Sequence, residues 1–275
     1  MPLFHLIILA LVQGITEFLP ISSSGHLILT HWALEGENAA QINFAANHLL
    51  DIAVHVGTLL AVILYFRTDV GHLIGGACDI ITRKETANRR LTLLVLIGSL
   101  PVILTGALMQ YYLPNILNSV AVIATISIVF GLLLGWADRR PEIKQDAGEM
   151  SLKQALMIGL MQAVALIPGT SRSGITMTAG RLLKLTRVEA ARFSLLLSMV
   201  AISGAGVLGG LSLYRNDVLV IGQDVVIGIL LSFFSAYATI WVMMKSLKSM
   251  SFMPFVIYRV ALGLVLLALL FFDVL

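Results

Sequence analysis

The stretch Pro168-Gly-Thr-Ser-Arg-Ser-Gly174 interrupts an apolar segment that begins at residue 154. A similar stretch, Pro20-Ile-Ser-Ser-Ser-Gly-His26, follows the apolar residues 3–19, and a second apolar piece follows each stretch. Because proline and glycine interrupt helices, each region predicts a broken or re-entrant segment instead of a simple membrane span. Irregular backbone at membrane depth is tolerated only where protein buries it or where it lines a wet cavity. Both breaks are therefore candidate functional sites.

The composition around the two breaks is that of a membrane protein. Hydrophobic residues make up 58% of the 275 residues, and charged residues make up 12%, about half the usual ~25%. A soluble protein of this size could not bury so much apolar surface. The composition excludes a disordered chain, a secreted disulfide scaffold and a nucleic-acid binder with a basic face. The single cysteine, Cys78, excludes an internal disulfide.

Six further segments have the length and apolarity of membrane spans, which need about 20 residues. They are residues 49–66, 91–112, 119–136, 193–214, 218–244 and 252–272. Fourteen Lys and Arg residues lie in four connections, namely residues 67–90, 137–153, 184–192 and 245–251. The connections on the other side of the membrane, residues 31–48, 113–118 and 215–217, contain a single basic residue, Arg215. Since basic residues favour the cytoplasmic side, these four connections are predicted to be solvated cytoplasmic loops of a multi-pass membrane protein.

An internal repeat with an offset of 149 residues relates the two breaks. The aligned pairs are Gln13 with Gln162, Ser22 with Ser171, Ser24 with Ser173 and Gly25 with Gly174. Each half has a broken segment followed by three spans, and because three is odd, the second half is inverted. The predicted fold is an all-α integral membrane protein with a single membrane domain, residues 1–275. Its first repeat is 1–136, its inverted repeat is 150–275, and its site lies at the midplane.

The first break supplies an acid, an imidazole and hydroxyl groups. Gln13 and Glu17 are four residues apart, so they share one helix face. A carboxylate within a bilayer is costly and is by default a functional candidate. The structural alternatives are an ion pair or a buried protonated acid for Glu17 and a packed histidine for His26. Glu17 is also a candidate ligand for a divalent cation, and a hard oxygen site favours Mg²⁺ or Ca²⁺.

The second break has the composition of a phosphate site. Backbone N–H groups at a helix start, hydroxyl groups and a guanidinium together bind anions, above all phosphate. Arg172 suits a bidentate grip on phosphoryl oxygens. The structural alternative is an ion pair between Arg172 and Glu17 that clamps the repeats together.

Other polar residues within the apolar segments carry weaker signals. Asp51 and His55, four residues apart, either close the site from the side or cap a helix at the interface. Arg259 lies seven residues into the last apolar segment. We expect its side chain to snorkel to the cytoplasmic interface rather than to reach inward toward phosphate.

The motifs Gln13-x-x-x-Glu17, Pro20-x-Ser-Ser-x-Gly-His26 and Pro168-Gly-x-Ser-Arg-Ser-x-x-Thr176 resemble those of the undecaprenyl-diphosphate phosphatase family linked to bacitracin resistance. The resemblance covers essentially the whole chain. It implies a hydrolase of the bacterial plasma membrane that converts undecaprenyl diphosphate to undecaprenyl phosphate and inorganic phosphate, recycling the lipid carrier for cell-wall synthesis. It also implies a divalent cation, re-entrant hairpins and a site facing the outer side.

The resemblance assigns roles by position. Glu17 and His26 match the acidic and imidazole catalytic groups, and Ser23 matches the proposed serine. The residues that match the phosphate-binding motif are Ser171, Arg172, Ser173 and Thr176, and we expect Gly169 and Gln13 to contribute to the diphosphate site. The family accepts Glu or Gln at the first motif position. Gln13 therefore argues against a mechanism with two carboxylates there.

Two alternatives stay open. The nucleophile is either Ser23 or a water activated by His26, with a slight preference for Ser23. The main alternative function is a polyprenyl-phosphate flippase or anion transporter with the same midplane site, because inverted repeats with broken helices are also a transporter architecture. An anion carrier needs Arg172 but no general base, so the acid, imidazole and serine favour the hydrolase. The sequence leaves open whether the chain forms a homodimer.

Overall fold

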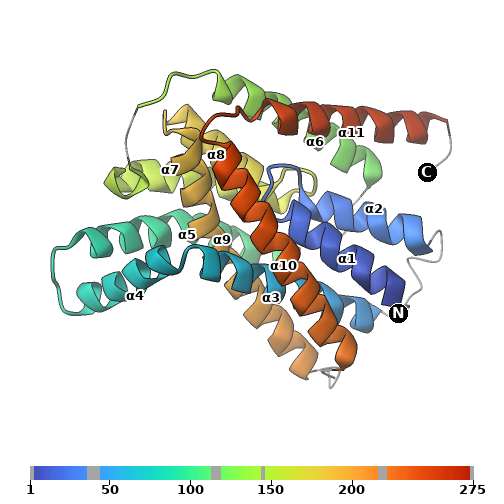
Figure 1. Cartoon of the computed structure of the whole chain (residues 1–275), viewed down its shortest axis with the longest axis horizontal. Coiled ribbons are helices and arrows are strands. Elements are labelled where there is room, and N and C mark those ends of the chain that lie inside the picture. The colour runs from blue at the N-terminus through green and yellow to red at the C-terminus, as the bar shows by residue number, and fades with distance from the viewer. Residues whose placement is uncertain (1–2, 36–43, 113–118, 144–145, 216–221, 273–275) are drawn as a thin grey trace. The chain divides into compact units, whose positions relative to one another are not determined.

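A computed structural model of the chain describes residues 3–35, 44–112, 119–143, 146–215 and 222–272 (Figure 1). Within these ranges all regular structure is helical, which confirms the all-α prediction there. In chain order the helices are α1 (Leu3–Thr16), α2 (Ser23–Glu35), α3 (Phe44–Tyr65), α4 (Arg67–Ile81), α5 (Ala87–Tyr112), α6 (Val120–Asp138), the 3₁₀ turn η3 (Ala147–Glu149), α7 (Leu152–Ala163), the 3₁₀ turn η4 (Val164–Leu166), α8 (Arg172–Leu182), α9 (Arg187–Arg215), α10 (Gln223–Ser246) and α11 (Met253–Phe271).

Among the described helices, five are long and apolar enough to cross a membrane: α5, α6, α9, α10 and α11. Helix α3 together with α4 makes a sixth if the pair counts as one interrupted span. These helices match the six predicted spans, except that residues 218–221 lie outside the described residues. The chain is therefore a multi-pass membrane protein.

Both predicted breaks are present in the structure. Helix α1 ends at Thr16 and α2 begins at Ser23, while η4 ends at Leu166 and α8 begins at Arg172. The residue before each second helix has a left-handed backbone, with φ of 75° at Ser22 and 68° at Ser171. Such angles are uncommon outside glycine and concentrate at functional sites.

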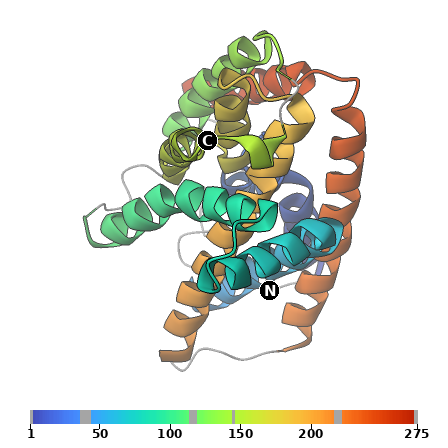
Figure 2. The ribbon, with the colours of Figure 1, turned by 90° about the vertical axis from the view of Figure 1, so that its left-hand side faces the viewer.

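The connection at residues 67–90, predicted to be a solvated loop, is instead largely helical. Helix α4 fills most of it and forms a hairpin with α5 (Figures 1 and 2). The prediction was wrong because α4 carries charges at its start and end, and these resemble a loop in the sequence. Its Gly76 packs against α5 so closely that a Cβ there would lie 2.2 Å from the Asn88 carbonyl oxygen.

The contacts divide the chain into two compact units. Unit 1 consists of residues 1–19, 23–65 and 199–243, and unit 2 consists of residues 20–22, 66–198 and 244–275. Helix α9 contributes its first part to unit 2 and its second part to unit 1. These units come from contacts within the structure, whereas the predicted repeats come from an offset in the sequence, so the units do not test the repeats. The domain organisation therefore stays a prediction.

Close helix packing surrounds the second break in unit 2. Helix α6 runs beside α11 and α5 beside α7, and α8 packs against α6 and α7 (Figures 1 and 2). At the α5–α7 contact, a Cβ on Gly159 would lie 2.4 Å from the Gly98 carbonyl oxygen. In unit 1, α1 packs against α2 and α3.

Candidate functional site

In unit 1 the first break is organised around the buried carboxylate of Glu17, whose side chain is 6% exposed. Helical bonding extends one residue past α1, since Glu17 N–H donates to the Gln13 carbonyl at 2.9 Å. Glu17 Oε2 accepts hydrogen bonds from Gln13 Nε2 at 2.7 Å and from Ser23 Oγ at 2.8 Å. The structure therefore brings together Gln13, Glu17 and Ser23. A serine that donates to a carboxylate is poised to lose its proton there.

Helix α3 adds a histidine to this group. His55 Nε2 lies 3.8 Å from Glu17 Oε2, and His55 Nδ1 lies 2.6 Å from the Asp51 carbonyl oxygen. When Nδ1–H donates to that carbonyl, the ring holds Nε2 toward the carboxylate. Of the two roles considered for His55, a position beside the site is the one observed. Its i, i+4 spacing from Asp51 within an apolar segment was the signal in the sequence.

His26 lies in the first turn of α2, three residues after Ser23, with a half-buried side chain. Residues three apart share one side of a helix. Its carbonyl accepts a hydrogen bond from Thr30 Oγ1 at 2.7 Å.

The oxygen atoms of the first break supply some, but not all, of the ligands that a hard divalent cation needs. The Glu17 carboxylate, the Ser23 hydroxyl and Gln13 are oxygen donors, and the buried Gln13 Oε1 has no hydrogen-bond partner in the part of the chain that the structure describes. The described residues contain no group of three His, Cys, Asp or Glu able to hold a metal. Mg²⁺ is usually held by one or two carboxylates with substrate phosphates and water, whereas zinc needs three or four protein ligands. The site therefore suits Mg²⁺ or Ca²⁺ in the presence of a phosphate substrate.

In unit 2 the second break folds into a loop, residues 167–171, which we call the phosphate loop. Gly169 has φ of 89°, and a Cβ there would lie 2.6 Å from the Ile123 carbonyl oxygen. Glycine is therefore required by both backbone angle and space. Ser171 Oγ accepts from Gly174 N–H at 3.1 Å and lies 3.2 Å from Ser173 Oγ. Ser171 thus caps α8 and directs the N-terminus of this helix, which favours anions, toward the loop.

The other predicted phosphate-binding side chains contact α9. Arg172 Nη1 donates to the Ser198 carbonyl at 3.2 Å, and Thr176 Oγ1 lies 2.6 Å from Ser194 Oγ. The sequence reasoning missed Ser194 and Ser198, although two serines four apart in an apolar helix were a usable signal. Gln13, which is expected to contribute to the diphosphate site, contacts Glu17 in unit 1.

Arg259 corrects the prediction that its side chain snorkels to the interface. Its side chain is fully buried, and its acceptors among the described residues are all carbonyls. The acceptors are Ser127 at 3.2 Å, Pro20 at 3.4 Å, and Gly169 and Thr170 at 2.9 Å each. No carboxylate among the described residues neutralises this guanidinium. Arg259 therefore ties Pro20 of the first break to the phosphate loop and leaves a positive charge directly behind it.

Comparisons with known proteins identify relatives along the whole chain. The family model described as "Bacitracin resistance protein BacA" matches residues 6–265. A Ruegeria pomeroyi protein named undecaprenyl-diphosphatase is 47% identical over 272 residues, covering 98% of this chain and 99% of the relative. Proteins of the same name from Jannaschia sp. and Saccharophagus degradans are each 46% identical. The first covers 98% of this chain and 99% of the relative, and the second covers 99% and 100%.

Proposed function

The chain belongs to the bacitracin resistance protein BacA family, and from this premise we propose that it converts undecaprenyl diphosphate to undecaprenyl phosphate and inorganic phosphate. It is a membrane phosphatase, and the relatives that carry this name match it along nearly their whole length. Its product is the lipid carrier used in cell-wall synthesis, and its membrane is the bacterial plasma membrane. The observation that carries the proposal is the bond from the Ser23 hydroxyl to the buried Glu17 carboxylate. A carrier protein would not need this pair.

The second break binds the phosphates. Arg172, the Ser171 and Ser173 hydroxyls and the N-terminus of α8 hold the terminal phosphate, and Thr176 fixes the first turn of this helix. Arg259 positions the loop through the Gly169 and Thr170 carbonyls. Its uncompensated charge adds to the attraction for an anion, because a buried charge is weakly screened.

The first break performs the reaction. Ser23 Oγ attacks the terminal phosphorus, the bond from this phosphorus to the bridging oxygen breaks, and undecaprenyl phosphate leaves. The Ser23 proton passes to Glu17, which already accepts its hydrogen bond. A water that loses its proton to His26 then attacks the phosphorus, the bond from phosphorus to Ser23 Oγ breaks, Ser23 recovers its proton from Glu17, and inorganic phosphate leaves.

Glu17 and Gln13 would hold a divalent cation, Mg²⁺ or Ca²⁺, through oxygen atoms. When bound, the cation supplies positive charge that offsets the charge of the two phosphates. The buried Gln13 Oε1 without a partner supports this assignment.

The inverted repeat is part of the proposal. The repeats are residues 1–136 and 150–275. Ser22 and Ser171, aligned by the 149-residue offset, both have a left-handed backbone directly before a helix. Gln13 and Gln162, aligned by the same offset, are fully buried and each leaves Oε1 without a partner. The resemblance to the family, and not the repeat, is the basis for proposing that the site opens to the outer side of the membrane.

Phosphate release from undecaprenyl diphosphate by the purified protein tests the function. We expect release with Mg²⁺ or Ca²⁺, none after EDTA, and nearly none from a folded Arg172→Ala variant. Absence of release from the native protein with cation present would refute the hydrolase. Movement of the lipid between leaflets under those conditions would favour the flippase.

A further inference from the structure

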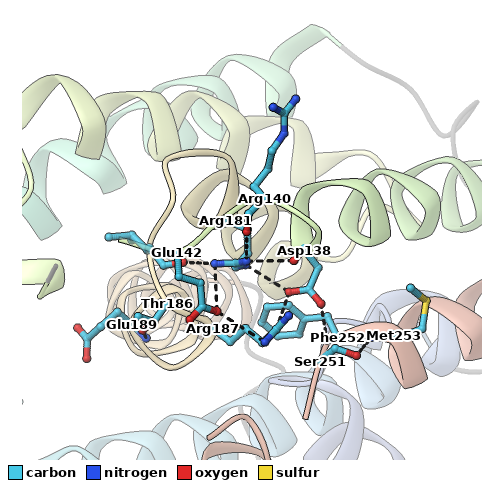
Figure 3. Close-up of polar contacts among 11 residues, drawn as sticks. Asp138, Arg140, Glu142, Arg181, Thr186, Arg187, Glu189, Ser251, Phe252 and Met253 are labelled. Carbon is cyan, nitrogen blue, oxygen red and sulfur yellow. Dashed lines mark hydrogen bonds and ion pairs between the residues drawn. The ribbon is translucent and has the colours of Figure 1, made fainter. Parts of the chain in front are cut away.

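The helix that begins with Arg172 ends at a second buried arginine, Arg181. Its side chain is 1% exposed and lies in the cluster shown in Figure 3. Its Nε donates to Asp138 Oδ1 at 3.2 Å, and Nη2 donates to the carbonyls of Asp138 at 3.0 Å and Arg140 at 2.7 Å. Its Nη1 donates to the Leu185 carbonyl. The guanidinium is thus held in one orientation.

Asp138, at the C-terminal end of α6, joins three further elements at this point. Its Oδ1 also accepts from Arg187 Nε of α9 at 2.7 Å, and its Oδ2 accepts from Phe252 N–H, just before α11, at 3.0 Å. The carboxylate is 4% exposed, whereas the Arg187 side chain is 28% exposed. One buried carboxylate therefore links the ends of α6 and α8 to the starts of α9 and α11 (Figure 3).

Helix α8 has only 11 residues, and nearly all of them are buried. A short helix contributes little stability by itself, so its neighbours decide its position. Arg259 bonds to the loop before its first residue, and Arg181 bonds to Asp138 near its last residue. Directional hydrogen bonds at both ends fix the position of α8 along its own axis and its rotation about that axis. Apolar packing alone defines these two quantities less precisely.

We propose that Arg181 is a positioning residue for the phosphate loop. It touches no substrate and acts through α8, nine positions along the chain from Arg172 and about 13 Å away at 1.5 Å per residue. The bond to Asp138 keeps Arg172, Ser173 and the start of the helix in register with the phosphate. This inference rests on the proposed function, since it assigns a further residue to the same reaction.

The test compares two arginines that donate to the same carboxylate oxygen. Arg181→Gln removes the bonds that hold the end of α8, whereas Arg187→Gln removes the contacts of α9 with Asp138 and Glu142 and leaves the bonds of Arg181 in place. We expect Arg181→Gln to lower kcat/KM for phosphate release roughly 10- to 100-fold, mostly through KM, because small displacements of binding groups have large effects. Arg187→Gln should change it by less than about threefold. Equal losses in the two variants would overturn the proposal.

A second readout separates positioning from a general loss of stability. The double variant Asp138→Leu/Arg181→Met replaces the buried pair by apolar groups, and such replacements often preserve folding. Because the change also leaves the Asp138, Arg140 and Leu185 carbonyls and the Phe252 N–H without these partners, we expect a lower unfolding temperature together with the raised KM. Its backbone amides at residues 169–176 should exchange hydrogen faster than in wild type, while those of α6 should not. A wild-type KM in this variant would overturn the proposal, and the exchange measurement stands even if the native protein releases no phosphate.

Discussion

Glu17 and Arg259 are both charged and buried, but their surroundings differ. Glu17 accepts hydrogen bonds from an amide and a hydroxyl and has a histidine nearby. Arg259 donates to four carbonyls and has no carboxylate partner among the described residues. The carboxylate is thus equipped to exchange a proton with Ser23. The guanidinium is equipped to hold backbone in place.

A substitution at Ser23 distinguishes the two candidate nucleophiles, which are the Ser23 hydroxyl and a water activated by His26. We expect Ser23→Ala to reduce phosphate release at least 10³-fold, because loss of a nucleophile removes the covalent route. Phosphate release by purified protein and ³²P-labelling of the serine measure this. Substantial turnover by the folded Ser23→Ala protein would favour a water activated by His26.

Removal of the Arg259 guanidinium should destabilise unit 2. Arg259→Met removes the donor of three carbonyls that lie outside helices, those of Pro20, Gly169 and Thr170, and each unsatisfied buried group costs about 1–3 kcal/mol. We expect the free energy of unfolding to fall by at least about 3 kcal/mol. Thermal unfolding in detergent measures the change. The control Arg67→Met alters an exposed arginine and should stay within about 0.5 kcal/mol; an equal drop there would contradict the argument.

At the scale of elements, the two breaks are helix starts preceded by a strained serine. Ser171 combines φ of 68° with ψ of 111°, outside the usual left-handed helical region, and still caps α8. The backbone angles of Ser171 therefore destabilise the folded protein through strain, while its hydroxyl stabilises helix α8.

Two substitutions at Ser171 separate these effects. Ser171→Ala removes the cap but keeps a side chain at positive φ, so we expect a loss of about 1–2 kcal/mol. Ser171→Gly removes the cap but relieves the backbone strain, so its loss should be smaller. Thermal unfolding of both variants gives the comparison. If glycine were the more destabilising substitution, the strain assignment would be wrong.

The sequence predicted the elements whose signal is local. The spans follow from apolar length, and the breaks follow from Pro20, Pro168 and the serines beside them. Helix α4 was missed because its charges resemble those of a loop. The direction of the Arg259 side chain depends on the rotation of α11 against α6, which no local pattern encodes. Asp138 and Arg181 are 43 residues apart, so their pairing depends on the tertiary fold.

For the candidate site, the sequence motifs nominate the residues, and which of them lie together was only partly predictable. The motifs identified Glu17 and Ser23, and the structure pairs them. The i, i+4 spacing anticipated the Gln13–Glu17 contact. His55 reaches Glu17 from another helix of unit 1, so its position required the packing of α3 against α1.

At the scale of the whole molecule, the distribution of basic residues predicts orientation. The single cysteine, Cys78, is exposed on α4, within a connection predicted to be cytoplasmic. A membrane-impermeant maleimide should therefore not label it in intact cells or right-side-out vesicles, and should label it in inverted vesicles.

A matched control places a cysteine at the opposite end of a span. Tyr214 is 69% exposed near the end of α9, next to Arg215, which lies in a connection predicted to be on the outer side. In a Cys78→Ser background, Tyr214→Cys should be labelled in intact cells. Labelling of both positions from the same side would reverse or invalidate the predicted topology.

Unit 1 is completed late during synthesis, because its segments are far apart in the sequence. Its segments 1–19 and 23–65 emerge first, but its remaining segment, 199–243, emerges only after all of residues 66–198. At about 5–20 residues per second, the ribosome takes on the order of ten seconds to make that intervening stretch. Two hydrogen-bond partners of Glu17, namely Gln13 and Ser23, are made in the first segments, before α10 exists. What the nascent chain must wait for is therefore the close packing of α10 against Gly14 of α1 and Gly57 of α3.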